Sequence, residues 1–171
     1  MKLAPIHIIG HPGCGKTTLM VEIIEELVKK GLKIGTIKHS AHHHELDKPD
    51  KDSYMHRKAG AFPAAMMTKD MAAIYLPKNK NYSPDDLIQQ YFSQVDIVLI
   101  EGWISGPYTK IEVFRDFFER EPLFHEVEKV KAFVLNQPIN SNDVKIAKIK
   151  GIQVIERTDV MKLLDYILSK N

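Results

Sequence analysis

The sequence contains one cysteine and one tryptophan, and only four of its basic residues are arginines. A lone cysteine, Cys14, cannot form a disulfide within the chain, so we expect a fold without covalent cross-links. The net charge is only +2, and the lysines are interspersed with acids rather than gathered in a basic block. Because nucleic-acid binding relies on concentrated positive charge, we predict no nucleic-acid partner.

Long hydrophobic runs are also absent. No apolar stretch approaches the roughly 20 residues of a membrane span, and the N-terminus lacks the charged-then-apolar pattern of a signal peptide. We therefore expect a cytoplasmic protein that does not contact membranes. The length of 171 residues, with 44% hydrophobic and 27% charged residues, suits a globular domain with a substantial core.

The segment from Gly10 to Thr18 reads GHPGCGKTT and fits G-x-x-x-x-G-K-[ST], the loop that wraps the phosphates of a nucleoside triphosphate. Glycines let the backbone approach a phosphate closely, and successive N–H groups form a nest for an anion. Lys16 would act as a catalytic residue at the β- and γ-phosphates, and the Thr17 hydroxyl would bind Mg²⁺. The residues expected to contact the nucleotide are Gly10, Pro12, Gly13, Cys14, Gly15, Lys16, Thr17 and Thr18.

The flanking sequence supports this interpretation. Leu3 to Ile9 is apolar and predicts a buried strand, whereas Met20, Ile23 and Leu27 recur at helical spacing after the loop. Strand, loop and helix thus follow in the order that the motif requires. A glycine-rich turn that binds nothing is the alternative, and these flanks argue against it. At a helix start, Cys14 could have a lowered thiol pKa and be reactive, although we favour a small side chain that merely fits the loop.

A second signal is the apolar run from Asp96 to Gly102, which is typical of a central parallel strand. Ligands of open α/β sheets bind at the carboxyl ends of such strands, so Glu101 should face the phosphate loop. We predict that Glu101 is a catalytic residue and, with Thr17, serves a Mg²⁺ site, as the acidic partner of the ion or of a metal-bound water. The alternative is an acid that ends a strand without a further role.

The remaining elements complete an α/β pattern. The sequence predicts further strands over residues 32–38, 111–115, 131–135 and 152–155, and a hairpin of two strands over 61–68 and 71–76. Helices are expected over residues 53–59, 83–92, 143–149 and 159–168. We predict one domain over residues 1–171, a three-layer α/β/α nucleotide-binding fold with a mostly parallel sheet and a peripheral β-hairpin.

A polar segment from Ser40 to Lys58 contains three adjacent histidines, His42, His43 and His44. Adjacent histidines converge poorly on one metal ion, so we favour a solvated loop over a metal site. Long loops of this kind are often functional, and the segment could instead contact a pterin phosphate or a partner protein.

Four motifs follow one another in one order: the phosphate loop; Lys38-His39 to His44; Pro49 to Ser53 with Arg57 to Ala61; and Glu101-Gly102 followed by Lys110-Ile111-Glu112-Val113. Together they resemble the MobB family of molybdopterin-guanine dinucleotide biosynthesis adaptor proteins, over Ile6 to Arg115. The resemblance implies a dimeric protein of P-loop NTPase fold that binds GTP with Mg²⁺ and hydrolyses it weakly. Its partners would be molybdopterin and the guanylyltransferase that attaches GMP to it.

The resemblance also suggests residues outside the phosphate loop. Those expected to line the cleft or to contact the pterin or the partner are Lys38, His39, Asp52 and Ser53. Arg115, which ends a predicted strand, could contact a phosphate or a partner. The sequence has no N-K-x-D motif for guanine, so Asn136 at another strand end is the candidate for contacting the base.

The main alternative function is a small P-loop kinase that phosphorylates a metabolite. Such kinases bring arginines from a mobile lid onto the transferred phosphate, whereas the four arginines here, Arg57, Arg115, Arg120 and Arg157, are not clustered in the sequence. No glutamine stands out that would position a water for fast hydrolysis. We therefore favour an adaptor with weak GTPase activity at most.

Overall fold

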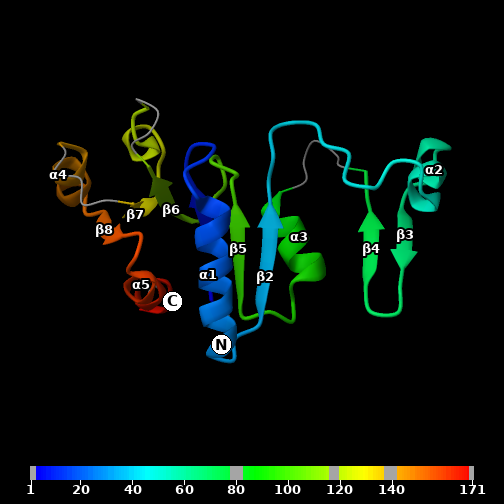
Figure 1. The fold of residues 1–171 in the computed structure, drawn as a ribbon, viewed down its shortest axis with the longest axis horizontal. Helices are drawn as coiled ribbons and strands as arrows, with labels where there is room; N and C mark the ends of the chain where they lie inside the picture. Colours follow the sequence, from blue (N-terminus) through cyan, green and yellow to red (C-terminus); the bar gives the residue numbers. More distant parts are fainter. Residues whose placement is uncertain (1–2, 78–82, 116–119, 137–141, 170–171) are drawn as a thin grey trace. The chain divides into compact units, whose positions relative to one another are not determined.

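The computed structural model describes residues 3–77, 83–115, 120–136 and 142–169 (Figure 1). The chain divides into two compact units, one of residues 1–40 and 87–171 and the other of residues 41–86. Each unit is described by itself, and a single domain over residues 1–171 stays a prediction. Within the described residues, no helix is both long enough and apolar enough to cross a membrane.

The first unit is built on a six-stranded sheet in the order β2-β5-β1-β6-β7-β8, and every strand pair in it is parallel. Parallel strands with both faces covered are apolar along most of their length, and these strands follow that pattern. Their bounds are β1 Ile6–Ile9, β2 Ile34–Lys38, β5 Ile97–Glu101, β6 Thr109–Phe114, β7 Val130–Leu135 and β8 Gln153–Glu156.

Helices cover both faces of this sheet. On one face, α1 (Lys16–Lys29) and α5 (Val160–Ser169) bury leucine and isoleucine side chains against alternate residues of the strands. On the other face, α3 (Pro84–Tyr91) covers β2 and β5, whereas α4 (Asn142–Ile149) and the short 3-10 helix η1 (Leu123–His125) cover β6 and β7. The predicted α/β class with a mostly parallel sheet is therefore confirmed.

The second unit contains α2 (Asp52–Lys58) and an antiparallel hairpin of β3 (Ala64–Met67) and β4 (Ala72–Tyr75), as predicted. Polar contacts tie it together. The buried Asp47 carboxylate accepts hydrogen bonds from the Ser53 hydroxyl at 3.1 Å and from Arg57 Nε at 3.3 Å. The Arg57 guanidinium also lies over the Tyr75 ring, 4.8 Å from its centroid.

Candidate nucleotide-binding site

The predicted phosphate loop connects β1 to α1 and is shaped by its glycines. Gly10, Gly13 and Gly15 have φ angles of +143°, +79° and +89°, in which L side chains are strained. Gly10 also packs against the neighbouring strand, because a Cβ there would lie 2.2 Å from the carbonyl oxygen of Val113. The glycines therefore allow both the turn and its close approach to β6.

Helix α1 starts at Lys16 with its amino end open to a ligand. Its N-cap residue is Gly15, and among the described residues no side chain makes a capping hydrogen bond to it. The first turn also contains no acidic residue. The first N–H groups of a helix have no partner within the helix, and the helix dipole favours an anion there. This helix end is therefore suited to a phosphate group. Exposed residues at this end are Pro12, Gly13, Thr17 and Thr18.

The Lys16 ammonium curls over the loop. It donates hydrogen bonds to the carbonyl oxygens of Gly10 at 2.9 Å and His11 at 2.8 Å. It also lies 3.8 Å from Sγ of Cys14, which is buried beneath it. Burial raises the pKa of the Cys14 thiol, so the suggestion of a lowered pKa is wrong and the thiol acts as a small buried group.

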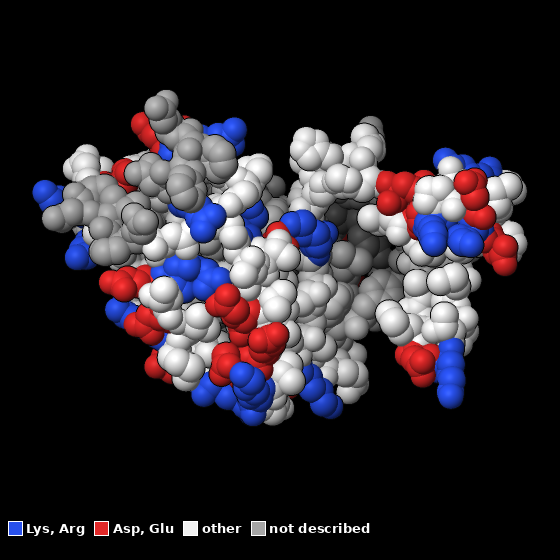
Figure 2. All heavy atoms as spheres, in the orientation of Figure 1, with Lys and Arg blue, Asp and Glu red and all other residues white. Residues whose placement is uncertain are grey.

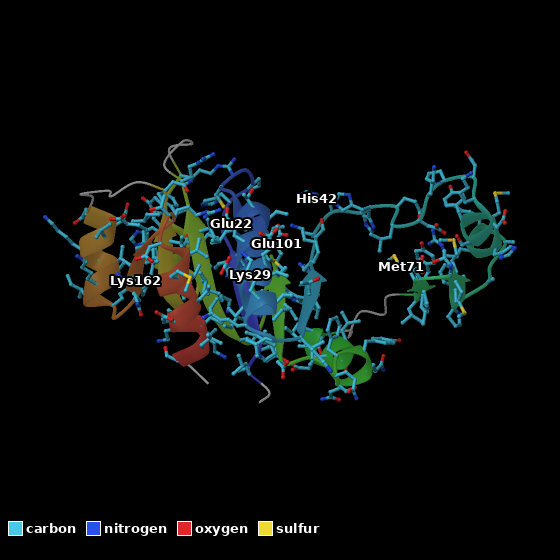
Figure 3. The ribbon with its side chains drawn as sticks, turned by 60° about the horizontal axis from the view of Figure 1, so that its bottom comes forward. Glu22, Lys29, His42, Met71, Glu101 and Lys162 are labelled. Atoms are coloured by element: carbon cyan, nitrogen blue, oxygen red, sulfur yellow. The ribbon has the colours of Figure 1, made fainter. Side chains whose placement is uncertain are left out.

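The end of β5 brings Glu101 against the loop, as Figure 3 shows. Glu101 stands beside Ile8 of β1 on one side and beside Lys38 of β2 on the other. The Thr17 hydroxyl donates a hydrogen bond to Glu101 Oε1 at 2.9 Å, and the Lys38 ammonium forms an ion pair with the same oxygen. The order of the strands, with the start of α1 directly after the loop, thus brings together three residues that are far apart in the sequence.

Thr17 and Glu101 fit a magnesium ion. Mg²⁺ prefers oxygen ligands and is commonly held by one or two protein side chains together with waters and substrate phosphates. The Thr17 hydroxyl and the Glu101 carboxylate supply such a pair, because they are already in contact beside the glycine-rich loop. By contrast, no group of three or more His, Cys, Asp or Glu residues within the described ranges is arranged to hold a metal ion by itself.

A stacked aromatic pair closes the same edge of the sheet. The rings of His39 and Trp103 are stacked with their centroids 4.5 Å apart. His39 directly follows the end of β2, and Trp103 lies two residues after the end of β5. Gly102 allows this contact, because its φ is +79° and a Cβ there would lie 2.7 Å from the His39 carbonyl oxygen. Sequence reasoning missed Trp103, although a single tryptophan after a strand-ending acid was an available signal.

The other predicted residues belong to other elements of the fold. Arg115 and Asn136 follow β6 and β7, whose carboxyl ends belong to the same edge as the loop. Asp52 and Ser53 belong to the second unit, where Ser53 is buried and bonded to Asp47. The roles proposed for these four residues in ligand or partner contacts stay predictions.

The surface charge is mixed. On the face shown in Figure 2, basic and acidic side chains are interspersed over the described residues.

The rings of His42 and His44 meet edge to face with their centroids 6.3 Å apart. The contact of this histidine segment with a pterin or partner protein stays a prediction.

Comparison with known proteins gives consistent matches. A family model described as molybdopterin guanine dinucleotide synthesis protein B, MobB, matches residues 6–136. The molybdopterin-guanine dinucleotide biosynthesis adapter protein of Haemophilus influenzae is 35% identical over 133 residues, which cover 77% of this chain and 74% of that protein. The adapter protein of Escherichia coli is 29% identical over 163 residues, which cover 91% of this chain and 86% of that protein.

Solved structures show the same fold. The crystal structure of Bacillus subtilis MobB superposes with a TM-score of 0.74 at 23% identity, covering 97% of this chain and 96% of that one. A MobB homologue from Bacillus stearothermophilus gives a TM-score of 0.68 at 19% identity, with 97% and 96% coverage. These likenesses confirm the predicted α/β fold with its mostly parallel sheet.

Proposed function

Because the chain belongs to the MobB family of molybdopterin guanine dinucleotide synthesis proteins, we propose that it is a GTP-binding adaptor in molybdenum cofactor biosynthesis. The observation that supports this most directly is the hydrogen bond from Thr17 to Glu101, made beside a glycine-shaped loop at the amino end of α1. An adaptor role agrees with the names of the relatives, whereas no described contact favours the small kinase.

The phosphate loop supplies the nucleotide contacts in this proposal. The N–H groups from Gly13 to Thr18 hold the phosphates, and Lys16 exchanges the Gly10 and His11 carbonyl oxygens for phosphate oxygens. Thr17 and Glu101 hold Mg²⁺, which when bound neutralises charge on the phosphates. Hydrolysis is expected to be weak, because Glu101 serves the magnesium ion in this proposal rather than positioning an attacking water.

Recognition of guanine is assigned to the strand ends beyond the loop. Asn136 follows β7 and is half-buried, and its amide group can both donate and accept hydrogen bonds. Arg115 follows β6 and is exposed, so its guanidinium can pair with a phosphate of the nucleotide or of a partner's ligand. GTP, rather than ATP, is the proposed nucleotide.

The proposed protein partner is the guanylyltransferase that attaches GMP to molybdopterin. Its expected contacts lie on Lys38 and His39 of the first unit and on Asp52 and the histidine segment of the second unit. Lys38 and Asp52 are exposed, and His39 is half-buried, so part of each group faces solvent. Ser53 supports this region from inside the second unit through Asp47.

The function is tested by reconstitution with purified guanylyltransferase, molybdopterin and Mg²⁺-GTP. Wild-type protein should raise the yield of the guanine dinucleotide cofactor and co-elute with the enzyme when GTP is present. Lys16→Ala should lose both effects, because the phosphates lose their main cation. Lys30→Ala, which removes an exposed lysine at the far end of the same helix, should behave as wild type. Equal behaviour of Lys16→Ala and wild type would contradict the proposal.

We further propose that the hairpin of the second unit pairs with a second copy of the chain. A two-stranded hairpin is only marginally stable by itself. Within the described residues β3 and β4 pair only with each other, so each strand has one edge without a neighbouring strand. Met67 and Met71 at its turn are 81% and 75% exposed. A self-complementary contact of two hairpins around a two-fold axis would cover both features.

Sedimentation of two variants tests this dimer. Met67→Asp should shift wild-type dimers to monomers, because it places a charge in the proposed apolar contact. Met161→Asp should not, since Met161 is a half-exposed methionine of α5 in the other unit. A dimer that withstands Met67→Asp as well as Met161→Asp would refute the hairpin as the contact.

A further inference from the structure

The ion pair between Lys38 and Glu101 places a cation on the carboxylate that the magnesium site requires. We propose that the Lys38 ammonium competes with Mg²⁺ for Glu101, so that metal loading displaces Lys38. Lys38 lies next to the segment of chain that leads into the second unit. The position of its side chain would therefore report to that segment whether the metal is bound. This inference rests on the proposed nucleotide function and adds a positioning residue to it.

The competition follows from the contacts of a single oxygen atom. Glu101 Oε1 accepts a hydrogen bond from Thr17 Oγ1 at 2.9 Å and also carries the Lys38 ammonium. Mg²⁺ can use the Thr17 oxygen and the Glu101 oxygen together, because both are hard ligands. Mg²⁺ and an ammonium group on the same carboxylate oxygen repel each other at that distance, so each weakens the other's hold on Glu101. Thr17 therefore remains as a ligand and Lys38 leaves.

Lys38 is the partner that is able to move. Its side chain is 59% exposed, whereas that of Glu101 is 8% exposed and projects from a strand with a neighbour on each side. A lysine has a long flexible stem and is well hydrated, so its ammonium can turn into water or toward the phosphates of a bound nucleotide. The carboxylate stays in place and exchanges one cation for another.

The position of Lys38 connects this exchange to the second unit. Lys38 ends β2, and the next residue, His39, donates its backbone N–H to the Glu101 carbonyl oxygen at 2.9 Å and stacks on Trp103. The first unit's N-terminal segment ends at Ser40, and residue 41 begins the second unit. The cation on Glu101 thus sits two residues before the junction. Displacement of Lys38 removes one of the attachments that hold this strand end.

The first test measures how strongly Mg²⁺ and nucleotide binding are coupled. The Kd of a GTP analogue with a fluorescent ribose group is measured in EDTA and in excess Mg²⁺. The ratio of the Kd in EDTA to the Kd in Mg²⁺ is then compared between variants. Lys38→Met should raise the ratio about two- to fivefold, in keeping with a largely exposed ion pair. In EDTA its Glu101 is left as an uncompensated negative charge beside the phosphates, and in Mg²⁺ no lysine has to be displaced.

Two control variants make the result specific. Lys38→Arg keeps the charge and should stay near the wild-type ratio. Lys33→Met removes an exposed lysine just before the other end of β2 and should leave the ratio unchanged, which controls for net charge. A wild-type ratio in Lys38→Met with normal nucleotide binding would overturn this inference alone. Absence of nucleotide binding by the wild type would overturn the proposed function as well.

A second measurement uses Trp103, the single tryptophan of the chain. In the wild type, adding Mg²⁺ to the protein with bound GTP analogue should change Trp103 emission, because Lys38 adjoins the histidine that stacks on it. In Lys38→Met this metal-dependent change should be smaller, since no ammonium leaves Glu101. An equal change in both proteins would contradict the connection between Lys38 and the strand end.

Discussion

Replacing Glu112 with glutamine should give the stability of this protein a pH dependence that Glu112 and His7 otherwise cancel. Both side chains are fully buried on the same sheet, Glu112 on β6 and His7 on β1. Burial raises the pKa of Glu112 to about 7, although two backbone N–H groups of η1 donate to its carboxylate at 2.6 and 2.9 Å. Burial, followed by the Lys110 ammonium, lowers the pKa of His7 to about 4.

The two shifts act in opposite directions on the free energy of unfolding. Glu112 has an ordinary pKa of 4.5, so between pH 4.5 and 7 the folded state keeps a proton that the unfolded state releases, and stability falls as pH rises. His7 has an ordinary pKa of 6.5, so between pH 6.5 and 4 the unfolded state takes up a proton that the folded state refuses, and stability falls as pH drops. From pH 4.5 to 6.5 the two slopes oppose each other.

The magnitude follows from the width of this shared window. Two pH units at about 1.4 kcal/mol per unit would give about 3 kcal/mol, and partial titration at the ends of the window reduces this to about 2 kcal/mol for each group. In Glu112→Gln the opposing Glu112 slope is lost and that of His7 remains, so the free energy of unfolding should be about 2 kcal/mol lower at pH 4.5 than at pH 6.5. His7→Gln should show the opposite slope, with greater stability at pH 4.5. The side-chain amide of either variant changes the absolute stability, and the slope is the quantity that tests the reasoning.

Urea unfolding at pH 4.5, 5.5 and 6.5 measures these slopes. Glu25→Gln, which removes an exposed glutamate of α1, serves as the control and should follow the wild type at each pH. If the free energies of unfolding of the wild type and Glu112→Gln changed with pH in the same way, the assignment of a proton to buried Glu112 would be refuted. They would instead mean that the η1 hydrogen bonds keep its carboxylate charged.

Four further substitutions test two glycine positions, an ion pair and a helix start by chemical or thermal unfolding. Gly10→Ala should lower the free energy of unfolding by about 3 kcal/mol or more, because its Cβ would lie 2.2 Å from a carbonyl oxygen. Gly15→Ala should lower it by only about 1–2 kcal/mol, the strain of its left-handed φ, since no atom outside its own neighbours lies within 4 Å of that Cβ. Arg157→Lys should cost about 0.5–1 kcal/mol, because it loses the two-pronged 2.7 Å contact with the partly exposed Glu22 carboxylate. Ser83→Ala should cost about 1 kcal/mol by removing the 3.3 Å hydrogen bond in the first turn of α3, and an unchanged melting temperature would contradict that role.

The sequence predicted the part of the site that is local. Residues 10–18 form a loop and helix start in one continuous stretch, and an apolar run with a terminal acid indicated Glu101 at a strand end. The meeting of Thr17 with Glu101 could also be expected, because parallel strands place their carboxyl ends at one edge of the sheet. The contact of Lys38 with Glu101 could not be expected from the sequence, since it depends on β2 being the neighbour of β5 in this register.

Burial of polar side chains was the least predictable feature. Glu112 alternates with apolar residues in β6, a pattern that suggests a solvated face, yet it is fully buried because η1 covers that face. Sequence analysis predicted no helix at η1, and a three-residue 3-10 helix has no periodicity that would reveal it. His7 is buried beneath the connection between β5 and β6, where a Cβ on Gly106 would lie 2.2 Å from the imidazole Cε1. Such tertiary coverage leaves no local pattern in either strand.

Direct titration of GTP and ATP into the wild type and Lys16→Ala, by calorimetry in the presence of Mg²⁺, tests the central claim most directly. The account predicts that the wild type binds GTP more tightly than ATP and that Lys16→Ala loses at least about tenfold in GTP affinity, because a charge-assisted contact to phosphate is removed. Equal GTP affinity in the wild type and Lys16→Ala, or a preference for ATP with phosphate transfer to a metabolite, would contradict it.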